Sequence, residues 1–185
     1  IKGISMIDPQ TVYFSADTKI GKNVTIQPNV FFGPQVQIGN NVLIKSNCHI
    51  EESRISNYVT VGPFARLRNG SDIAEKTKIG NFVEVKKSRI KKNVKISHLS
   101  YVGDANIGED VNIGAGSITC NYDGFKKNKT FIGSGCFIGS NTSLIAPIKI
   151  KKNSIVGAGT VVDKNVKEST LVYRKSELVK KNKKK

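Results

Sequence analysis

The stretch 98–129 holds most of the residues whose types could do chemistry. His98 follows the apolar Ile96 by two positions, so its side chain is expected to face outward, with Tyr101 and Asn112 near it on the same face. A neutral imidazole beside a bound amine can accept the proton of that amine while the amine attacks an electrophile. We therefore interpret His98 as a candidate general base, against the simpler reading of a solvated surface histidine.

Cationic side chains lead toward His98 along the preceding part of the chain. Arg68 and Lys86 are about one expected coil apart, and Lys127 lies on a lysine-rich loop. Converging guanidinium and ammonium groups suit a phosphate, so together they predict a phosphorylated substrate, although each alone reads as a surface charge. No serine or cysteine stands at a recognisable spacing from a base, which favours direct transfer over a covalent intermediate.

The elements that must position these residues follow a six-residue repeat. Large apolar residues recur every six positions, and each is followed four positions later by a small or β-branched one. The first block is Phe14, Ile20, Ile26, Phe32, Ile38, Ile44 and Ile50, with Thr18, Val24, Val30, Val36, Val42 and Cys48 beside them. The rhythm slips by single residues up to Ile113, breaks over 119–131 and returns from Ile132 to Val162. Slips of one residue preserve a coil, whereas the break predicts a projecting loop.

Six-residue repeats predict an all-β fold, the left-handed parallel β-helix, in which each coil buries one large residue per face. A β-sandwich would have no reason to keep a six-residue phase over whole blocks. Three faces per coil give roughly 18 residues per coil, hence about eight coils in a triangular prism. Since a prism with flat, partly apolar faces associates most safely in closed symmetry, we expect a homotrimer.

The repeat also divides the chain. We expect residues 1–12 to be a linker into the first coil, 13–168 to be the β-helix domain, and 169–185 to be a basic tail. Arg174 stands out in the tail because a guanidinium can bind a phosphate through two hydrogen bonds. The chain starts at Ile1 rather than Met, so we expect it to be a piece of a longer protein.

Composition narrows the function classes. The net charge of +16 attracts phosphorylated ligands and nucleic acids alike, but the lysines fall in turns and tail and no Trp accompanies them, so no nucleic-acid binding is expected. Three cysteines without a CxxC pair or a histidine at ligand spacing predict neither disulfides nor a metal site. No apolar run reaches ~18 residues, so we expect no membrane span and a cytoplasmic protein.

Three runs carry a resemblance to a known family. They are Gly62–Arg68 (GPFARLR), Gly80–Lys87 (GNFVEVKK) and Asn112–Gly124 (NIGAGSITCNYDG). From about Asp8 to Arg174 the chain resembles the acetyltransferase half of the bifunctional bacterial glucosamine-1-phosphate acetyltransferase and N-acetylglucosamine-1-phosphate uridylyltransferase family. The family's nucleotidyltransferase domain is absent from these residues, so no uridylyl transfer by this chain is expected.

The resemblance implies a trimeric enzyme that moves acetyl from acetyl-CoA to the amine of glucosamine 1-phosphate, in the biosynthesis of UDP-N-acetylglucosamine for peptidoglycan and lipopolysaccharide. It implies that His98 is the general base and that no metal is required. The implied sugar-phosphate site is Arg68, Lys86, Tyr101, Asn112 and Lys127. The implied acetyl-CoA site is Ala115, Asn121, Tyr122, Ser140, Ala158 and Arg174. The implied sites lie between subunits.

Two other readings stay open at this point. The first is a hexapeptide acyltransferase with a different amino-sugar or serine acceptor. The second is a purely structural or binding prism, which would show a flat face of repeated threonines, and the sequence lacks such a face.

Overall fold

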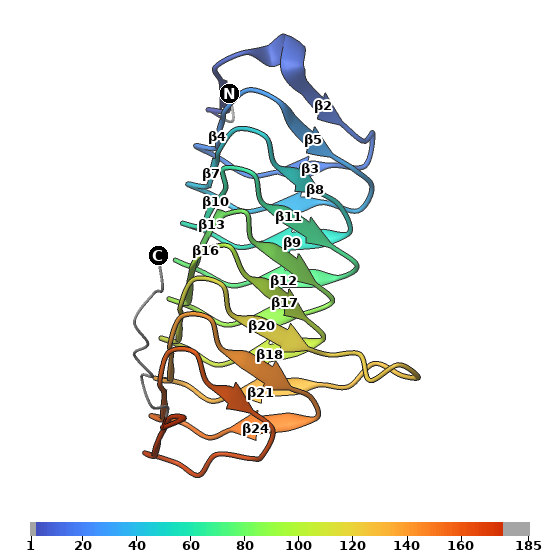
Figure 1. The fold of residues 1–185 in the computed structure, drawn as a ribbon. Helices are drawn as coiled ribbons and strands as arrows, with labels where there is room; N and C mark the ends of the chain where they lie inside the picture. Colours follow the sequence, from blue (N-terminus) through green and yellow to red (C-terminus); the bar gives the residue numbers. More distant parts are fainter. Residues whose placement is uncertain (1–2, 176–185) are drawn as a thin grey trace, which may run out of the picture.

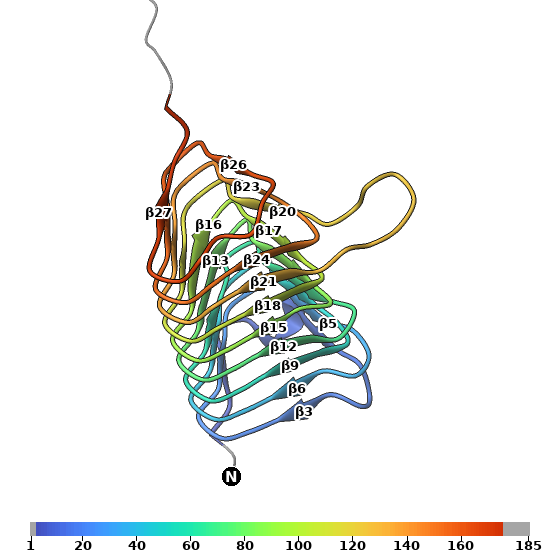
Figure 2. The ribbon, with the colours of Figure 1, turned by 90° about the horizontal axis from the view of Figure 1, so that it is seen from below.

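The structure, a computed structural model that describes residues 3–175, is a parallel β-helix of stacked triangular rungs (Figure 1). Three parallel sheets form its faces, with ten, nine and eight strands. The view along the axis shows the triangular outline and one loop that leaves it (Figure 2). The predicted all-β repeat fold is confirmed, and the rungs number slightly more than the eight expected.

The strands of each face follow one another every third element. The ten-stranded sheet contains β1 (Ser5–Met6), β4 (Thr25–Ile26), β7 (Leu43–Ile44), β10 (Thr60–Val61), β13 (Lys78–Asn81), β16 (Lys95–His98), β19 (Asn112–Ile113), β22 (Phe137–Ile138), β25 (Ile155–Val156) and β27 (Leu171–Val172). The nine-stranded sheet contains β2 (Val12–Phe14), β5 (Val30–Phe32), β8 (His49–Ile50), β11 (Arg66–Arg68), β14 (Glu84–Lys86), β17 (Tyr101–Gly103), β20 (Ile118–Cys120), β23 (Ser143–Ile145) and β26 (Val161–Val162). The eight-stranded sheet contains β3 (Lys19–Ile20), β6 (Gln37–Ile38), β9 (Ser53–Ile55), β12 (Ser71–Ile73), β15 (Arg89–Ile90), β18 (Ala105–Ile107), β21 (Thr130–Ile132) and β24 (Ile148–Ile150).

The residues of the six-residue repeat form the core. Ile26, Phe32, Ile44 and Ile50 are all buried, and the residues predicted beside them, such as Val24, are buried as well. Burying one such aliphatic side chain contributes about 1.5–3 kcal/mol. The rungs therefore stack through a continuous column of apolar side chains.

Two large residues of the predicted core are not fully buried. Phe14 is 41% exposed and Ile20 is half-buried. Both lie in the first strand of their sheets, β2 and β3, so no rung covers them on one side. Phe14 stacks on Phe32 with ring centroids 5.0 Å apart, which shields only one of its faces.

The ends of the β-helix reach past the predicted boundaries. Strand β1 lies inside the predicted linker and pairs with β4, and a 3-10 turn, η1 (Pro9–Thr11), capped by Asp8, leads into β2. At the other end β27 lies inside the predicted tail and pairs with β25. Residues 176–185, the lysine-rich end of that tail, lie outside the described residues.

Candidate active site

One corner of the prism carries a column of small and polar residues. At this corner the chain passes from the ten-stranded to the nine-stranded sheet, and successive rungs place one residue each at the same position. These residues are Asn81, His98, Ala115, Ser140 and Ala158. Backbone hydrogen bonds join neighbouring rungs here: Leu99 N donates to Asn81 O (2.9 Å), Asn141 N to Ala115 O (2.7 Å) and Gly159 N to Ser140 O (2.8 Å). The pairing of Ile96 with Ile113 places Ala115 next to His98.

The corner therefore brings four predicted site residues into one line. His98, the predicted base, is followed along the axis by Ala115, Ser140 and Ala158, all predicted to contact acetyl-CoA. Rungs are about 4.8 Å apart, so a long, thin ligand lying along this corner would contact each in turn.

His98 has a side-chain partner that sets its tautomer. Its Nδ1 lies 2.6 Å from Oδ1 of Asn81, the residue beside it in the register of β13 and β16. An amide oxygen only accepts, so Nδ1 carries a proton, and in the neutral ring the lone pair is on Nε2. The side chain is exposed, as predicted, and Ser100 Oγ donates to the His98 carbonyl at 2.8 Å. The hydrogen bond to Asn81 thus fixes which ring nitrogen of the neutral imidazole can accept a proton.

Sequence reasoning missed Asn81. It lies in one of the family-like runs, but its pairing with His98 depends on the number of residues in that rung, which is 17 here. Counting back one rung from the predicted base would have found it.

The cations form a second group on the nine-stranded sheet. Arg68 and Lys86 are partners in the register of β11 and β14, as predicted. Arg68 Nε donates to Glu84 Oε1 at 2.6 Å and Arg68 Nη1 donates to Asn69 Oδ1 at 2.8 Å. The carboxylate orients the guanidinium and offsets part of its charge. Two cationic side chains therefore stand side by side, with one of them already held in place.

Tyr101 belongs to the second group. It pairs with Glu84 in the register of β14 and β17, and its hydroxyl accepts a hydrogen bond from Nδ2 of the buried Asn121 at 3.3 Å. Asn121 marks the point where the chain leaves the nine-stranded sheet. Tyr101 and Asn121, predicted for the sugar and for acetyl-CoA respectively, thus contact one another.

Residues 121–129 form the loop that projects from the prism between β20 and β21 (Figure 2). Asp123 organises it by accepting hydrogen bonds from Phe125 N (2.9 Å) and Lys126 N (2.8 Å) and from Asn128 Nδ2 (2.8 Å). These bonds lower the pKa of Asp123 to about 2. Across the loop, Tyr122 and Lys127 form an antiparallel bridge.

The loop presents Lys127 together with an aromatic ring. Lys127 Nζ lies 4.2 Å from the centre of the Tyr122 ring, a cation–π contact. Arg68 and Lys86 lie on neighbouring strands of the nine-stranded sheet, whereas Lys127 lies on the loop that leaves this sheet after β20. The convergence of the three cations on one phosphate stays a prediction.

Two predicted residues stand apart from both groups. Asn112 pairs with Lys95, and Lys95 precedes His98 by three residues. Three residues of a strand span about 10 Å, so Asn112 is displaced from His98 by about this distance along the strand direction. Arg174 is exposed and follows β27. Among the described residues, neither forms a hydrogen bond with the His98 side chain.

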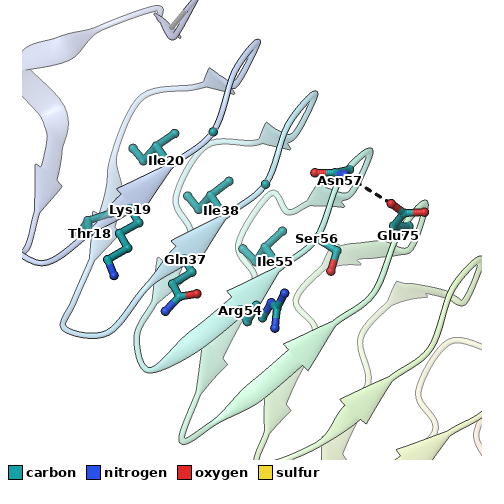
Figure 3. A pocket seen from close by; sticks show the side chains of 12 residues that line it. Thr18, Lys19, Ile20, Gln37, Ile38, Arg54, Ile55, Ser56, Asn57 and Glu75 are labelled. Carbon is teal, nitrogen blue, oxygen red and sulfur yellow. Dashed lines mark hydrogen bonds between the residues drawn. The ribbon is translucent and has the colours of Figure 1, made fainter.

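A groove of about 640 Å³ lies on a different face. Figure 3 shows Lys19, Gln37 and Arg54 along it, on neighbouring strands of the eight-stranded sheet, with a hydrogen bond of 3.3 Å from Asn57 Nδ2 to Glu75 Oε1. None of the predicted site residues lines this groove, so the groove is not part of the predicted site.

Neither a metal centre nor a membrane segment is found in the described part of the chain. Residues 3–175 contain no cluster of three His, Cys, Asp or Glu side chains that could hold a metal ion. Among the same residues, no helix has the length and apolar character needed to cross a membrane.

Comparisons with known proteins agree with the repeat. The family model described as bacterial transferase hexapeptide (six repeats) matches residues 17–52 and 129–164. Among solved structures, a UDP-N-acetylglucosamine acyltransferase from Campylobacter jejuni superposes with a TM-score of 0.82 at 17% identity, covering 90% of this chain and 70% of that one. LpxA from Acinetobacter baumannii gives 0.78 at 16% identity, covering 94% and 71%. These structures share the fold.

Curated relatives are much more similar in sequence. Bifunctional protein GlmU from Zymomonas mobilis is 53% identical over 175 residues, which is 95% of this chain and 39% of the relative. GlmU from Paramagnetospirillum magneticum is 55% identical over 177 residues, again 95% and 39%. The chain spans about two fifths of the length of these relatives. The resemblance drawn from the three sequence runs is confirmed over nearly the whole chain.

Proposed function

We propose that this chain is a glucosamine-1-phosphate N-acetyltransferase, which moves acetyl from acetyl-CoA to the sugar amine and yields N-acetylglucosamine 1-phosphate. The observation that carries the proposal is the 53% identity to bifunctional GlmU over 95% of the chain. The product would feed UDP-N-acetylglucosamine biosynthesis for peptidoglycan and lipopolysaccharide, in the cytoplasm. The part of GlmU that the chain does not cover would carry the uridylyl transfer.

The chemistry follows from the state of His98. Its Nε2 accepts a proton from the sugar amine as the amine nitrogen attacks the thioester carbonyl. The carbon–sulfur bond then breaks, and the protonated Nε2 returns this proton to the leaving sulfur, so that CoA is released as a thiol. The developing oxyanion requires an N–H donor, expected near Ala115 or Asn121. The backbone N–H of Ala115 forms no hydrogen bond within the described chain, so it is free to donate, a contribution that reaches about 3 kcal/mol.

The remaining predicted residues would bind the two substrates. The sugar phosphate would be held by Arg68, Lys86 and Lys127, with Tyr101 and Asn112 on its hydroxyls. Acetyl-CoA would contact Ala115, Asn121, Tyr122, Ser140, Ala158 and Arg174. Phosphate binding away from the reacting centre would place the amine against the thioester.

We further propose that the active form is a homotrimer with sites between subunits. His98 lies at a corner of the prism, whereas Arg68 and Lys86 lie on the nine-stranded face, where Lys86 pairs with Gly103, five residues after His98. A neighbouring copy that packs against this corner would bring its own cations or loop to His98. The separation of the two groups supports a shared site.

Acetyl transfer assays test the acceptor. We expect transfer to glucosamine 1-phosphate to exceed transfer to unphosphorylated glucosamine by at least about a hundredfold in kcat/KM, because charge-assisted phosphate contacts contribute about 3 kcal/mol or more. Equal rates with both acceptors would show that the cations have another role. Transfer only to a different amino sugar or to serine would support the alternative acyltransferase.

The chain offers a matched control for the base, because it contains only two histidines. His98→Ala should lower kcat by about 100- to 10,000-fold, the usual contribution of a general base. His49→Ala should leave kcat unchanged, since His49 is an exposed residue that stacks on Phe31 and lies 3.7 Å from Glu51. Equal activity of the two variants would remove His98 as the base.

A further inference from the structure

Asn121, at the base of the projecting loop, is only 5% exposed. Its Nδ2 lies 2.6 Å from Oδ2 of Asp104, which is itself 8% exposed. A carboxylate can only accept hydrogen bonds, so the amide group must turn its nitrogen toward Asp104. The orientation of the Asn121 amide is therefore determined by a buried acid on the previous rung.

This arrangement uses every donor of Asn121. Nδ2 donates its second hydrogen to the Tyr101 hydroxyl at 3.3 Å, and the backbone N–H of Asn121 donates to Thr119 O at 2.9 Å. Oδ1 forms no hydrogen bond within the described chain and is not among its buried polar atoms that lack a partner. Toward any ligand, Asn121 can consequently act only as an acceptor.

The neighbouring backbone is adapted to this contact. A Cβ at Gly103 would overlap the Tyr101 hydroxyl and would lie 2.7 Å from Asn121 Nδ2. Glycine at this position leaves the space in which the two side chains meet. The side chains of Asp104, Asn121 and Tyr101 thus pack together, with Asn121 as the hydrogen-bond donor to both of the others.

We propose that Asp104 is a positioning residue, which holds Asn121 so that its Oδ1 accepts a hydrogen bond from an amide N–H or a hydroxyl of the bound substrates. The inference rests on the proposed acetyl transfer and deepens it. Asn121 then cannot donate to the thioester oxyanion, which leaves that role to another donor such as the free N–H of Ala115.

Exchanging the two side chains tests the proposal. Asn121→Asp alone places two carboxylates together without a donor, and it should lower Tm and reduce kcat/KM for acetyl-CoA by at least about tenfold. The double variant Asp104→Asn with Asn121→Asp restores the hydrogen bond in the opposite direction. Since position 121 still presents only acceptor atoms, kcat/KM should return to within about threefold of the original protein.

A second pair gives a matched control. Asn93 Nδ2 donates to Asp110 Oδ1 at 3.0 Å, also across 17 residues, but both side chains are exposed. The same exchange there should change neither Tm nor kcat/KM.

Two results would overturn the proposal. A double variant that regains Tm but stays as slow as Asn121→Asp would show that Asn121 acts as a donor. One that does not regain Tm would show that the bond to Asp104 does not hold Asn121. An unmodified chain without acetyl transfer would instead reject the proposed function, and the thermal comparison would still decide whether Asp104 fixes Asn121.

Discussion

At the scale of single residues, hydrogen bonds from neighbouring rungs decide what each site residue can do. Asn81 leaves His98 with a free Nε2, and Glu84 holds the guanidinium of Arg68. Both partners come from an adjacent rung of the same face, so their distances depend on backbone pairing rather than on flexible loops. Rigid pairing of this kind keeps a catalytic group in one orientation.

Asn81 offers a test of that control. Asn81→Ala removes the partner of Nδ1, so the imidazole can adopt either tautomer, and kcat should fall by about tenfold with little change in KM. Asn81→Asp places a carboxylate beside the ring and favours the protonated imidazole. The acid limb of the pH–rate profile should then move to higher pH. Unchanged profiles in both variants would show that Asn81 does not act through His98.

The lowered pKa of Asp123 predicts how the projecting loop responds to acid. Backbone and side-chain hydrogen bonds lower its pKa from 3.8 to about 2, so the folded loop favours the carboxylate. A lowered pKa stabilises the loop above pH 3.8, and that stabilisation is lost as the pH falls toward 2. NMR should show the Phe125 and Lys126 amide signals titrating near pH 2 and not near pH 4.

A variant separates this effect from general acid unfolding. Asp123→Ala should raise KM for the sugar phosphate several-fold, because Lys127 would no longer be held, while Tm of the prism stays the same. A lowered Tm with an unchanged KM would contradict the assigned role of the loop.

At the scale of strands and corners, the repeat predicts most of what the structure contains. From β4 to β19, neighbouring strands of the ten-stranded face are offset by 18 or 17 residues, which corresponds to the single-residue slips seen in the sequence. One rung spans 25 residues, from Asn112 to Phe137, because it includes the loop. The spacing of apolar residues predicts the core directly, because each inward-facing position of a rung must hold a side chain that can be buried.

The pairs at the site were harder to predict. Asn81 with His98 and Asp104 with Asn121 are rung neighbours 17 residues apart. Polar residues on the outside of the prism have no spacing rule of their own, and an error of one residue in a slip changes the predicted partner. The individual residues could be found from the sequence, but their contacts required the register.

Gly80 shows how strictly a corner depends on the register. A Cβ there would overlap the backbone of Ser97, on the rung that carries His98. Gly80→Ala should therefore lower the free energy of unfolding by about 2–3 kcal/mol and disturb the Asn81–His98 pair. Denaturant unfolding and kcat measure the two effects.

Gly70 is the control for this substitution. It has a φ of +79° but open space around the missing Cβ, so Gly70→Ala should cost only about 1 kcal/mol and leave kcat intact. Equal costs at the two positions would contradict the steric explanation for Gly80.

At the scale of the whole molecule, the corner of the prism that carries Asn81 and His98 also carries exposed apolar side chains. Phe64, Phe82 and Leu99 occupy successive rungs, are 48–60% exposed and have positive φ angles of 46–55°. A bulky residue in this backbone conformation costs about 1–2 kcal/mol, where asparagine or glycine would cost less. Contact with another copy of the chain would compensate for that cost and would cover the apolar column.

The proposed trimer therefore predicts which surface controls assembly. In analytical ultracentrifugation the unmodified chain should sediment with three times the 20.2 kDa mass of one chain. Phe82→Glu should shift it toward monomers and lower acetyl transfer, because the charge would be buried unpaired between chains. Tyr58→Glu is the control: Tyr58 is also exposed with a positive φ but lies at a different corner, so the trimer should persist. Dissociation by Tyr58→Glu with an intact Phe82→Glu trimer would place the interface at the other corner, and the shared site would have to be sought there.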